Sequence, residues 1–394
     1  MQWPACRSEA RPWRQSVRGG TAADRKLAEI EVCIPPLIAH LPISFTTAAV
    51  TAMENATHEI SQLHAVGESQ LRGLGALLLR SESVASSKIE NLEASLEDFG
   101  RAFHGLKANS SATSMVQAMH SIQELMRAVE TSGEITLEML LKTHARLMAN
   151  DPSERGYAGK LRDMQNWVGG SDHSPRNAML IPAPPNLLPQ LLDDLIAFAN
   201  RDDVPALAQA AIAHAQFETI HPFTDGNGRV GRALINAILM RRRASGLLTP
   251  IATALVARRD EYFALLNGYR AGELEPLVIA ISKAAEVAAK EACLTAQSLA
   301  DLEPRWREAL GNPRSHSTLT EMLPHFLETP FVTVEDASGW TTTAASRVYS
   351  AIERCEAIGI LRPLTNRQRG QIWGVIDVLD ELDDLADRVS QALR

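Results

Sequence analysis

The chain has 394 residues, more than one typical domain holds, and 45% of them are hydrophobic, which is enough for more than one core. Its formal net charge of −8 at pH 7 argues against general affinity for nucleic acids or membrane surfaces, and no stretch of about 18 apolar residues predicts a membrane span. The four cysteines are widely separated, without metal-ligand spacing or a disulfide pattern, so we expect a reducing, cytoplasmic environment.

Low aromatic content and abundant alanine and leucine favour helices. Residues 1–29 lack the apolar core of a secretory signal and predict a partly ordered arm. Residues 151–189 are rich in Gly, Pro, Asn and Ser, and within them 178–182 follows the turn formers 174–177 and predicts a hairpin. On either side, apolar periodicity predicts helices over 46–74, 77–104, 114–131, 136–148, 186–200, 206–220, 229–243, 258–269 and 274–310.

Beyond residue 310 the pattern predicts a winged helix. Helices are expected over 318–327, 333–337 and 342–358, followed by strands at 360–364 and 371–375 around a basic turn. The candidate nucleic-acid contacts are arginines, namely Arg347, Arg354, Arg362, Arg367 and Arg369. These arginines are few and several carboxylates follow them, so dimerisation or target docking is favoured over DNA binding by 333–375.

The residues between two of the predicted helices, His221-Pro-Phe-Thr-Asp-Gly-Asn-Gly-Arg-Val-Gly-Arg232, have the composition of a phosphate site. Gly226 and Gly228 allow positive φ and close approach to a ligand. The amides that begin the following helix lack intrahelical acceptors and carry the positive end of its dipole, so they favour an anion. Arg229 and Arg232 are three residues apart and project from roughly one face, where their guanidinium groups suit phosphate oxygens.

The same segment supplies groups for a metal and for proton transfer. Asp225 offers a hard oxygen that, together with phosphate oxygens, suits Mg²⁺. His221 has an unperturbed pKa of about 6.5, close to the working pH of a general base. Asn227 is a candidate donor to a phosphate oxygen. These residues predict a loop that holds a nucleoside polyphosphate with its metal beside a base, although no Walker-type Gly-Lys-Ser/Thr is present.

This segment resembles the signature of the Fic family, His-Pro-Phe-x-Asp/Glu-Gly-Asn-Gly/Lys-Arg-x-x-Arg, at every specified position. The resemblance implies transfer of AMP from ATP to a Ser, Thr or Tyr hydroxyl of a protein. It implies that His221 takes the hydroxyl proton and that Asp225 binds the Mg²⁺ between the α- and β-phosphates. Asn227 and the amides of Gly226 and Gly228 would hold the phosphates. Arg229 would contact the β-phosphate and Arg232 the γ-phosphate.

Two further segments resemble parts of the same family. Residues 156–162 are similar to the segment ahead of the family's flap, and 179–185 look like the flap itself, although Ala183 stands where proline is more usual. The resemblance implies that the flap pairs with a target strand by β-augmentation. The flap residues proposed for docking are Ala178, Met179, Leu180 and Ile181.

The segment Ser86-Ser-Lys-Ile-Glu90-Asn91 matches the family's inhibitory pattern, Ser/Thr-x-x-x-Glu-Gly/Asn. One guanidinium fork cannot fully serve a carboxylate and a γ-phosphate at once. We therefore expect Glu90 to compete for Arg232, so that ATP binds in an unproductive pose and Glu90→Gly activates the chain.

The sequence thus predicts a mainly α protein: a Fic-type helical bundle with a β-hairpin flap and a small C-terminal winged-helix (α+β) domain. The predicted divisions are an arm (1–29), an N-terminal helical region with the inhibitory helix (30–112), a catalytic core (113–310) and a winged-helix-like domain (311–394). The expected partners are ATP, Mg²⁺, a protein target, and a second copy of the chain in a homodimer. The chain itself is one candidate target. The alternatives are a regulatory scaffold that binds nucleotide without transferring it, and a different phosphate chemistry such as phosphocholine or UMP transfer, or AMP removal.

Overall fold

The computed structural model describes residues 3–394 except 17, 67, 243–246 and 366–369, and it describes residues 68–72 without their side chains. The chain folds into two compact units, each assembled from separate stretches of sequence. The first unit comprises Met1–Asn55, Ser121–Ala244 and Arg259–Lys283, and the second comprises Ala56–His120, Ser245–Arg258 and Ala284–Arg394. The contiguous divisions predicted from the sequence do not coincide with these units.

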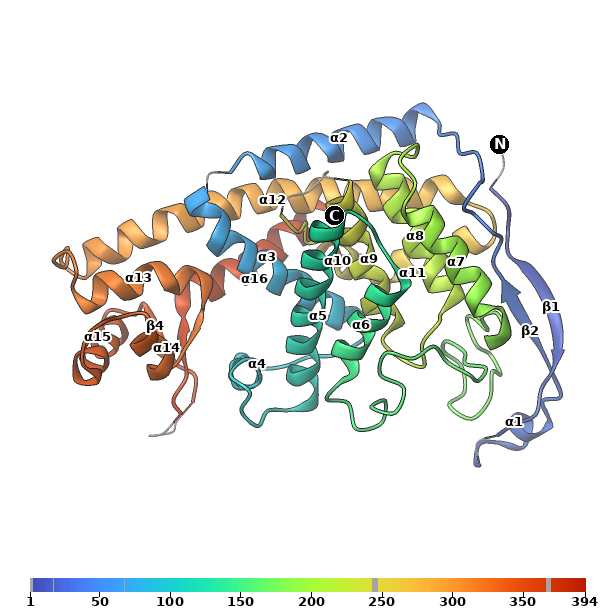
Figure 1. The fold of residues 1–394 in the computed structure, drawn as a ribbon, viewed down its shortest axis with the longest axis horizontal. Coiled ribbons are helices and arrows are strands. Elements are labelled where there is room, and N and C mark those ends of the chain that lie inside the picture. Colours follow the sequence, from blue (N-terminus) through green and yellow to red (C-terminus); the bar gives the residue numbers. More distant parts are fainter. Residues whose placement is uncertain (1–2, 17, 67, 243–246, 366–369) are drawn as a thin grey trace. The chain divides into compact units, whose positions relative to one another are not determined.

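The described part of the chain is mainly helical, as predicted (Figure 1). Three helices pass from one unit to the other: α2 (Thr47–His64), α5 (Ser110–Ser132) and α12 (Leu274–Ala309). The predicted helices 46–74 and 77–104 have the wrong boundaries, because α2 ends at His64 and α3 (Glu68–Ile89) spans the interval between them. Within the described residues, each helix is too short or too polar to cross a lipid bilayer.

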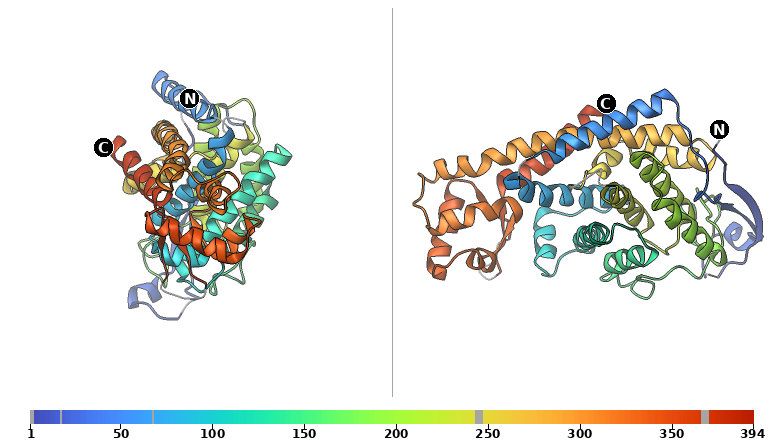
Figure 2. Two further views of the ribbon diagram at one scale, coloured as in Figure 1. Left: turned by 90° about the vertical axis from the view of Figure 1, so that its left-hand side faces the viewer. Right: turned by 45° about the horizontal axis from the view of Figure 1, so that its top comes forward.

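The first unit is built around a helix that is buried on all sides. Its helices are α6 (Leu137–Met148), α7 (Leu188–Ala199), α8 (Ala206–Ile220), α9 (Asn227–Arg241) and α11 (Arg259–Arg270), with the short 3₁₀ turn η1 (Pro185–Leu187) ahead of α7. α8 contacts both α7 and α9 (Figure 1; Figure 2 gives two further views). Its residues 207–220 are all buried. This even apolar character is typical of a core helix rather than a surface one.

The close packing of α8 and α9 depends on Gly231. A Cβ at this position would overlap the Oε1 of Glu218 and would lie 3.1 Å from the Cδ1 of Phe217. Because cores pack at nearly crystalline density, any larger residue here would push the two helices apart. The glycine therefore sets the distance between the helix that ends at the candidate site and the helix that begins there.

An antiparallel hairpin precedes these helices, where the sequence predicted only a partly ordered arm. β1 (Arg7–Pro12) pairs with β2 (Glu29–Ile34) in the register Arg7↔Ile34 to Pro12↔Glu29. The short helix α1 (Ala22–Lys26) lies in the connection, and Thr21 and Asp24 form a capping box at its start. β1 is polar and gives no strand signal by itself; its partner β2 buries Ile30 and Val32 and thereby fixes the pairing.

The second unit combines helices with one small sheet. Its helices are α3, α4 (Leu96–Phe103), α10 (Ile251–Ala257), α13 (Thr318–Glu328), α14 (Val334–Gly339), α15 (Ala345–Ala357) and α16 (Ile376–Ala392). The strands are β3 (Phe331–Val332), β4 (Leu361–Pro363) and β5 (Trp373–Val375), which form an antiparallel sheet in the order β3–β5–β4. The predicted basic turn, with Arg367 and Arg369, lies outside the described residues.

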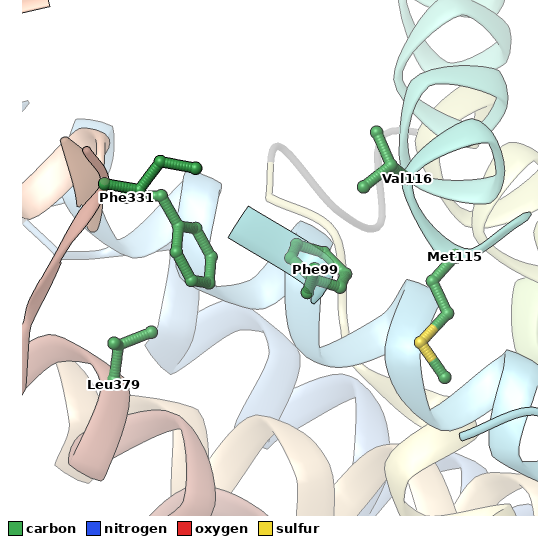
Figure 3. Packing of buried hydrophobic residues seen from close by; sticks show 6 residues of the cluster. Phe99, Met115, Val116, Phe331 and Leu379 are labelled. Atoms are coloured by element: carbon green, nitrogen blue, oxygen red, sulfur yellow. The ribbon is translucent and has the colours of Figure 1, made fainter. Parts of the chain in front are cut away.

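The core of the second unit joins segments that are far apart in the sequence. Its buried cluster consists of Phe99, Met115, Val116, Phe331, Ile372 and Leu379 (Figure 3). The rings of Phe99 and Phe331 are 5.5 Å apart, and the guanidinium of Arg80 lies 5.3 Å from the centre of the Phe331 ring. The C-terminal strands therefore share one core with α3, α4 and α5 instead of forming a core of their own.

Candidate active site

The loop predicted to carry the chemistry lies between α8 and α9, as expected. α8 ends at Ile220, and His221 closes it in the left-handed conformation, with φ 49° and ψ 62°. Its amide donates to the carbonyl of Phe217 at 2.9 Å. A residue other than glycine adopts this conformation only where the surroundings impose it, and such residues cluster at functional sites.

The ring of His221 is oriented by the helix that it terminates. Its Nδ1 lies 3.4 Å from the carbonyl oxygen of Glu218. Because a carbonyl only accepts hydrogen bonds, this contact places the ring proton on Nδ1 and the lone pair on Nε2. The side chain is partly exposed, and Nε2 is the ring nitrogen with which it could accept a proton.

Arg162, which is only 2% exposed, holds the end of α8 in place. Its Nε donates to the carbonyl of His221 at 2.8 Å, and its Nη2 donates to the carbonyl of Ile220 at 3.3 Å and to that of Ala183 at 2.6 Å. The guanidinium thus satisfies carbonyls that have no partner within the helix. Burial lowers its pKa to about 10, which leaves it charged at neutral pH. The sequence analysis gave this residue no role.

We expect Arg162→Lys to lower the free energy of unfolding by about 2–4 kcal/mol, because an ammonium cannot replace the fork and several buried carbonyls lose their donor. Arg25→Lys is the control, because the exposed Arg25 donates from Nη1 to the Gly20 carbonyl at 2.7 Å, away from the loop. Its replacement should cost about 1 kcal/mol or less. Urea unfolding measures both values, and equal losses would refute the special role of Arg162.

Two asparagines fix the backbone of the loop at Phe223. The side-chain amide of Asn227 accepts from the Phe223 amide and donates to the Phe223 carbonyl, both at 2.9 Å. Asn166 donates to the same carbonyl at 2.9 Å. Asn227 was predicted as a donor to phosphate, but its side chain is 2% exposed and shapes the loop, so its contribution to an anion site would come from its backbone amide.

The two glycines of the loop differ in conformation. Gly226 has a φ of 74° and caps α9, and a Cβ there would lie 3.1 Å from the Cδ2 of Leu147 and 3.2 Å from the Sδ of Met148. Gly228, by contrast, lies inside the first turn of α9, so only one of the two expected positive φ angles occurs here. No side chain caps this helix, so its first amides are directed to where an anion would bind.

The charged side chains follow directly. Arg229 and Arg232 are 7% and 1% exposed, whereas 57% of the Asp225 side chain is exposed. The Nη2 of Arg229 lies 3.5 Å from the Oδ2 of Asp225. The first two turns of α9 thus combine helix amides with two guanidinium groups, and one accessible carboxylate stands at the edge. Among the residues that the structure describes, no three His, Cys, Asp or Glu side chains form a group that could hold a metal by themselves.

His144, on α6, is a supporting residue that the sequence analysis missed. Its Nδ1 accepts from the Gly159 amide at 3.0 Å, so its Nε2 carries the proton and donates to the Asp225 carbonyl at 3.1 Å. Its ring stacks on Phe223 at 3.8 Å between centroids. Burial lowers its pKa to about 4, so the ring is neutral at pH 7.

The depressed pKa of His144 predicts a loss of stability in acid. Its contribution is fully present above the unfolded-state pKa of about 6.5, and it is lost as the pH falls toward the folded-state value of about 4. This amounts to about 3 kcal/mol. Buried His214, with a pKa lowered to about 3, acts in the same direction, so a comparison of variants is required. The stability gap between wild type and His144→Gln should shrink from pH 7 to pH 4; a constant gap would contradict this account.

The predicted hairpin is present ahead of α7. The amide of Val168 donates to the Leu180 carbonyl, and the amide of Met179 donates to the Val168 carbonyl, both at 2.8 Å. Asn177 turns the chain with a φ of 60°. The Met179 side chain is 63% exposed. On the other side of this strand, the amide of Cys33 donates to the Ile181 carbonyl at 2.7 Å, a contact that the sequence did not predict.

The candidate inhibitory segment ends α3. Asn91 has a φ of 58°, its amide donates to the Lys88 carbonyl at 2.9 Å, and the amide of Leu92 donates to the Ser87 carbonyl at 3.1 Å. These bonds form a Schellman motif, which explains why the pattern requires Gly or Asn after the glutamate. Ser86 is buried, whereas Glu90 is exposed. This segment belongs to the second unit, and the loop with His221 belongs to the first.

Comparison with known proteins identifies the family of the region around this loop. Residues 134–239 match the model of the Fic/DOC family. The chain is 35% identical over 157 residues to protein adenylyltransferase fic-1 of Caenorhabditis briggsae, covering 39% of this chain and 28% of that protein. It is 32% identical over 161 residues to protein adenylyltransferase Fic of Nematostella vectensis, covering 40% and 34%. The chain thus spans only a minor part of these curated relatives.

Solved structures show the same fold over a longer range. A Fic family protein from Desulfovibrio desulfuricans superimposes with a TM-score of 0.55 at 18% identity, covering 85% of this chain and 97% of that one. Fic-1 from C. elegans gives a TM-score of 0.52 at 22% identity, covering 64% and 73%. At these identities the likeness establishes the fold only. What the site can do chemically depends on the residues of the loop.

Proposed function

Because residues 134–239 form a Fic/DOC family domain, we propose that this chain transfers AMP from ATP to a Ser, Thr or Tyr hydroxyl of a protein. The observation that carries the proposal is the loop itself. His221 closes α8, and Gly226 opens α9, which has no side-chain cap at its start. A base and an anion-binding helix end therefore stand within a few residues of each other. The similarity to proteins named protein adenylyltransferase supports AMP rather than another group.

In this proposal each group of the loop has one role. The Nε2 of His221 accepts the proton of the target hydroxyl, whose oxygen attacks the α-phosphorus of ATP. The new P–O bond joins AMP to the target, and the bond to the β-phosphate breaks with release of pyrophosphate. The amides at the start of α9 receive phosphate oxygens, and the guanidinium groups of Arg229 and Arg232 offset the charge of the leaving group.

Asp225 is the proposed ligand for Mg²⁺. Its side chain is the exposed carboxylate of the loop, and its hard oxygens suit this ion when phosphate oxygens and water complete the shell. When bound, the ion would neutralise negative charge on the phosphates. His144 donates a hydrogen bond to the backbone carbonyl of Asp225, and this bond helps to fix the backbone that carries the carboxylate.

We propose that Glu90 restrains the reaction and that the hairpin at 178–181 guides the target. The Glu90 assignment is supported by the match of residues 86–91 to the inhibitory pattern and by the position of Glu90 directly after the last residue of α3, Ile89. Ala178, Met179, Leu180 and Ile181 are proposed as the docking residues, supported by the exposed side chain of Met179 beside a short strand. The target class is a protein with an accessible hydroxyl, which includes a second copy of this chain.

We propose that residues 311–394 form a winged-helix-like module that docks a protein, a second copy in a homodimer included. The order α13, β3, α14, α15, β4, β5 and the sheet order β3–β5–β4 support this description. Arg354, a candidate DNA contact, donates to the Leu310 carbonyl at 3.1 Å, which supports a structural role for it. A salt-dependent mobility shift with duplex DNA would instead favour nucleic-acid binding.

The proposed function is tested by asking which labelled phosphate of ATP is transferred to protein. The purified chain is incubated with a cell lysate and ATP labelled on either the α- or the γ-phosphate, and labelled proteins are identified by mass spectrometry. Incorporation of the α-label should depend on the added chain and be lost with His221→Ala, and it should appear as a mass increase of one AMP on a hydroxyl. Kinases of the lysate transfer the γ-label on their own, so this variant sets the background for both labels. Incorporation of the γ-label above that background, or no α-label above it, would overturn the assignment.

A further inference from the structure

The N-terminal hairpin brings together two cysteines that are 27 positions apart in the sequence. Ser8 pairs with Cys33 across the strands, and side chains two apart lie on the same face, so Cys6 and Cys33 are diagonal neighbours. A hydrogen bond between the two thiols raises the pKa of Cys6 and lowers that of Cys33. Both side chains are free thiols and only partly buried. The sequence alone suggested no pairing.

This hairpin is tied to the flap at three points, all within the first unit. The amide of Cys33 donates to the Ile181 carbonyl at 2.7 Å, and Cys33 forms a parallel bridge with Pro182. The hydroxyl of Ser174 donates to the carboxylate of Asp24 at 2.6 Å. The third point is an edge-to-face contact between Trp13 and Trp167, with ring centroids 5.7 Å apart.

Cys6 and Cys33 also line a groove together with residues of the flap. The groove has a volume of about 530 Å³, and Cys6, Cys33 and Arg270 line it together with flap residues 178–181. The Cys6 amide donates to the Arg270 carbonyl at 2.8 Å, which holds the start of β1 against α11. The two cysteines thus line the same groove as the residues proposed for target docking.

We propose that Cys6 and Cys33 form a peroxide-sensitive pair that closes to a reversible disulfide. The bond would cross-link the two arms of the hairpin, stiffen the end of β2 that is hydrogen-bonded to the flap, and so slow transfer to a protein target. The effect on transfer rests on the proposed function, whereas the disulfide and the stiffening of the flap do not. Fixing an edge that must adjust to an incoming strand is expected to slow docking.

The chemistry balances with hydrogen peroxide as the oxidant. The Cys33 sulfur, as thiolate, attacks one peroxide oxygen; the O–O bond breaks, and the sulfenic acid and a hydroxide ion form. The hydroxide becomes water by taking up the proton that the Cys33 thiol had released to the solvent. The Cys6 sulfur then attacks the Cys33 sulfur, the S–S bond forms, and the second oxygen leaves as water with the Cys6 proton. The Arg270 guanidinium lowers the pKa of Cys33 and so favours the reactive thiolate.

The first experiment maps the bond. The full-length protein is treated with peroxide, the remaining thiols are alkylated, and peptides are analysed without reduction. A Cys6–Cys33 linked peptide should appear and should disappear with dithiothreitol. Cys6→Ser and Cys33→Ser should abolish it, while Cys293→Ser and Cys355→Ser should leave it unchanged. Recovery of Cys6 and Cys33 as separate alkylated peptides after full oxidation would overturn the proposal.

The second experiment measures the flap. Hydrogen exchange of peptides covering 30–34 and 178–183 should slow about tenfold on oxidation of the wild type and should not change in oxidised Cys6→Ser. Exchange that is unaffected by oxidation would refute the coupling even if the disulfide forms.

The third experiment measures transfer. The rate onto a protein target should fall about tenfold on oxidation and recover with dithiothreitol. Cys6→Ser should not respond to peroxide. A rate that does not change with oxidation would refute the effect on transfer. If neither redox state transfers AMP, the proposed function fails, and the peptide map and the exchange data still decide the inference on the thiols.

Discussion

Replacement of His221 by asparagine should lower the rate of AMP transfer by about 10²–10⁴-fold, the usual contribution of a general base. The contact of His221 Nδ1 with the Glu218 carbonyl favours the tautomer with its lone pair on Nε2, and an asparagine amide cannot accept a proton in its place at neutral pH. Affinity for ATP should change little, because the proposed phosphate contacts come from α9. Rates are measured with α-labelled ATP, and affinity is measured by equilibrium binding.

Asparagine is chosen because His221 sits at a φ of 49°, a conformation that asparagine tolerates better than most residues. His221→Ala is the matched comparison. It removes the same base but adds backbone strain, so it should lose the same activity and also some stability. Residual transfer by His221→Asn within about threefold of wild type would exclude His221 as the base.

The second large effect is a gain in the rate of AMP transfer. Glu90→Gly should raise the rate of AMP transfer at least about tenfold, which corresponds to roughly 1.4 kcal/mol in the barrier. The reason is the proposed competition of the Glu90 carboxylate with the γ-phosphate for Arg232. The substitution leaves the end of α3 intact, because the bonds that close it join the backbone of residues 87, 88, 91 and 92.

A matched control separates charge from position. Glu93 is an exposed carboxylate three residues later, so Glu93→Gln removes one negative charge near the same helix end without touching residue 90. It should leave the rate unchanged, while Glu90→Gln should activate nearly as well as Glu90→Gly. Equal rates for wild type and both Glu90 variants would remove this residue from any regulatory role.

The parts of the site that could be read from the sequence are those encoded in one continuous segment. The loop with His221, Asp225 and Gly226 lies between two strongly apolar stretches, so the two helices and the turn between them follow from local pattern. The turn formers at 174–177 likewise predicted the hairpin near Ala178. Helical periodicity also located most of the remaining helices, with errors mainly at their ends.

The supporting residues could not be predicted, because they reach the loop through tertiary contacts. Arg162 and His144 lie about 60 and 80 positions before the atoms that they bind. Arg162 falls in the segment 156–162 that resembles the family, but nothing in that segment indicates that its side chain binds the end of α8. The strand β1 was missed because its sequence is polar and its conformation depends on β2. The predicted role of the Asn227 side chain overlooked the backbone of Phe223, whose groups it satisfies.

The contacts of Asn227 and His144 with main-chain atoms separate the shape of the loop from its chemistry. Phe223 is held through its amide and carbonyl, and Asp225 is held through its carbonyl, while the Asp225 carboxylate points to the outside. A substitution of that carboxylate therefore leaves the scaffold standing. Evolution, or a protein engineer, can therefore exchange the proposed metal-binding group at this position without rebuilding the loop that carries it.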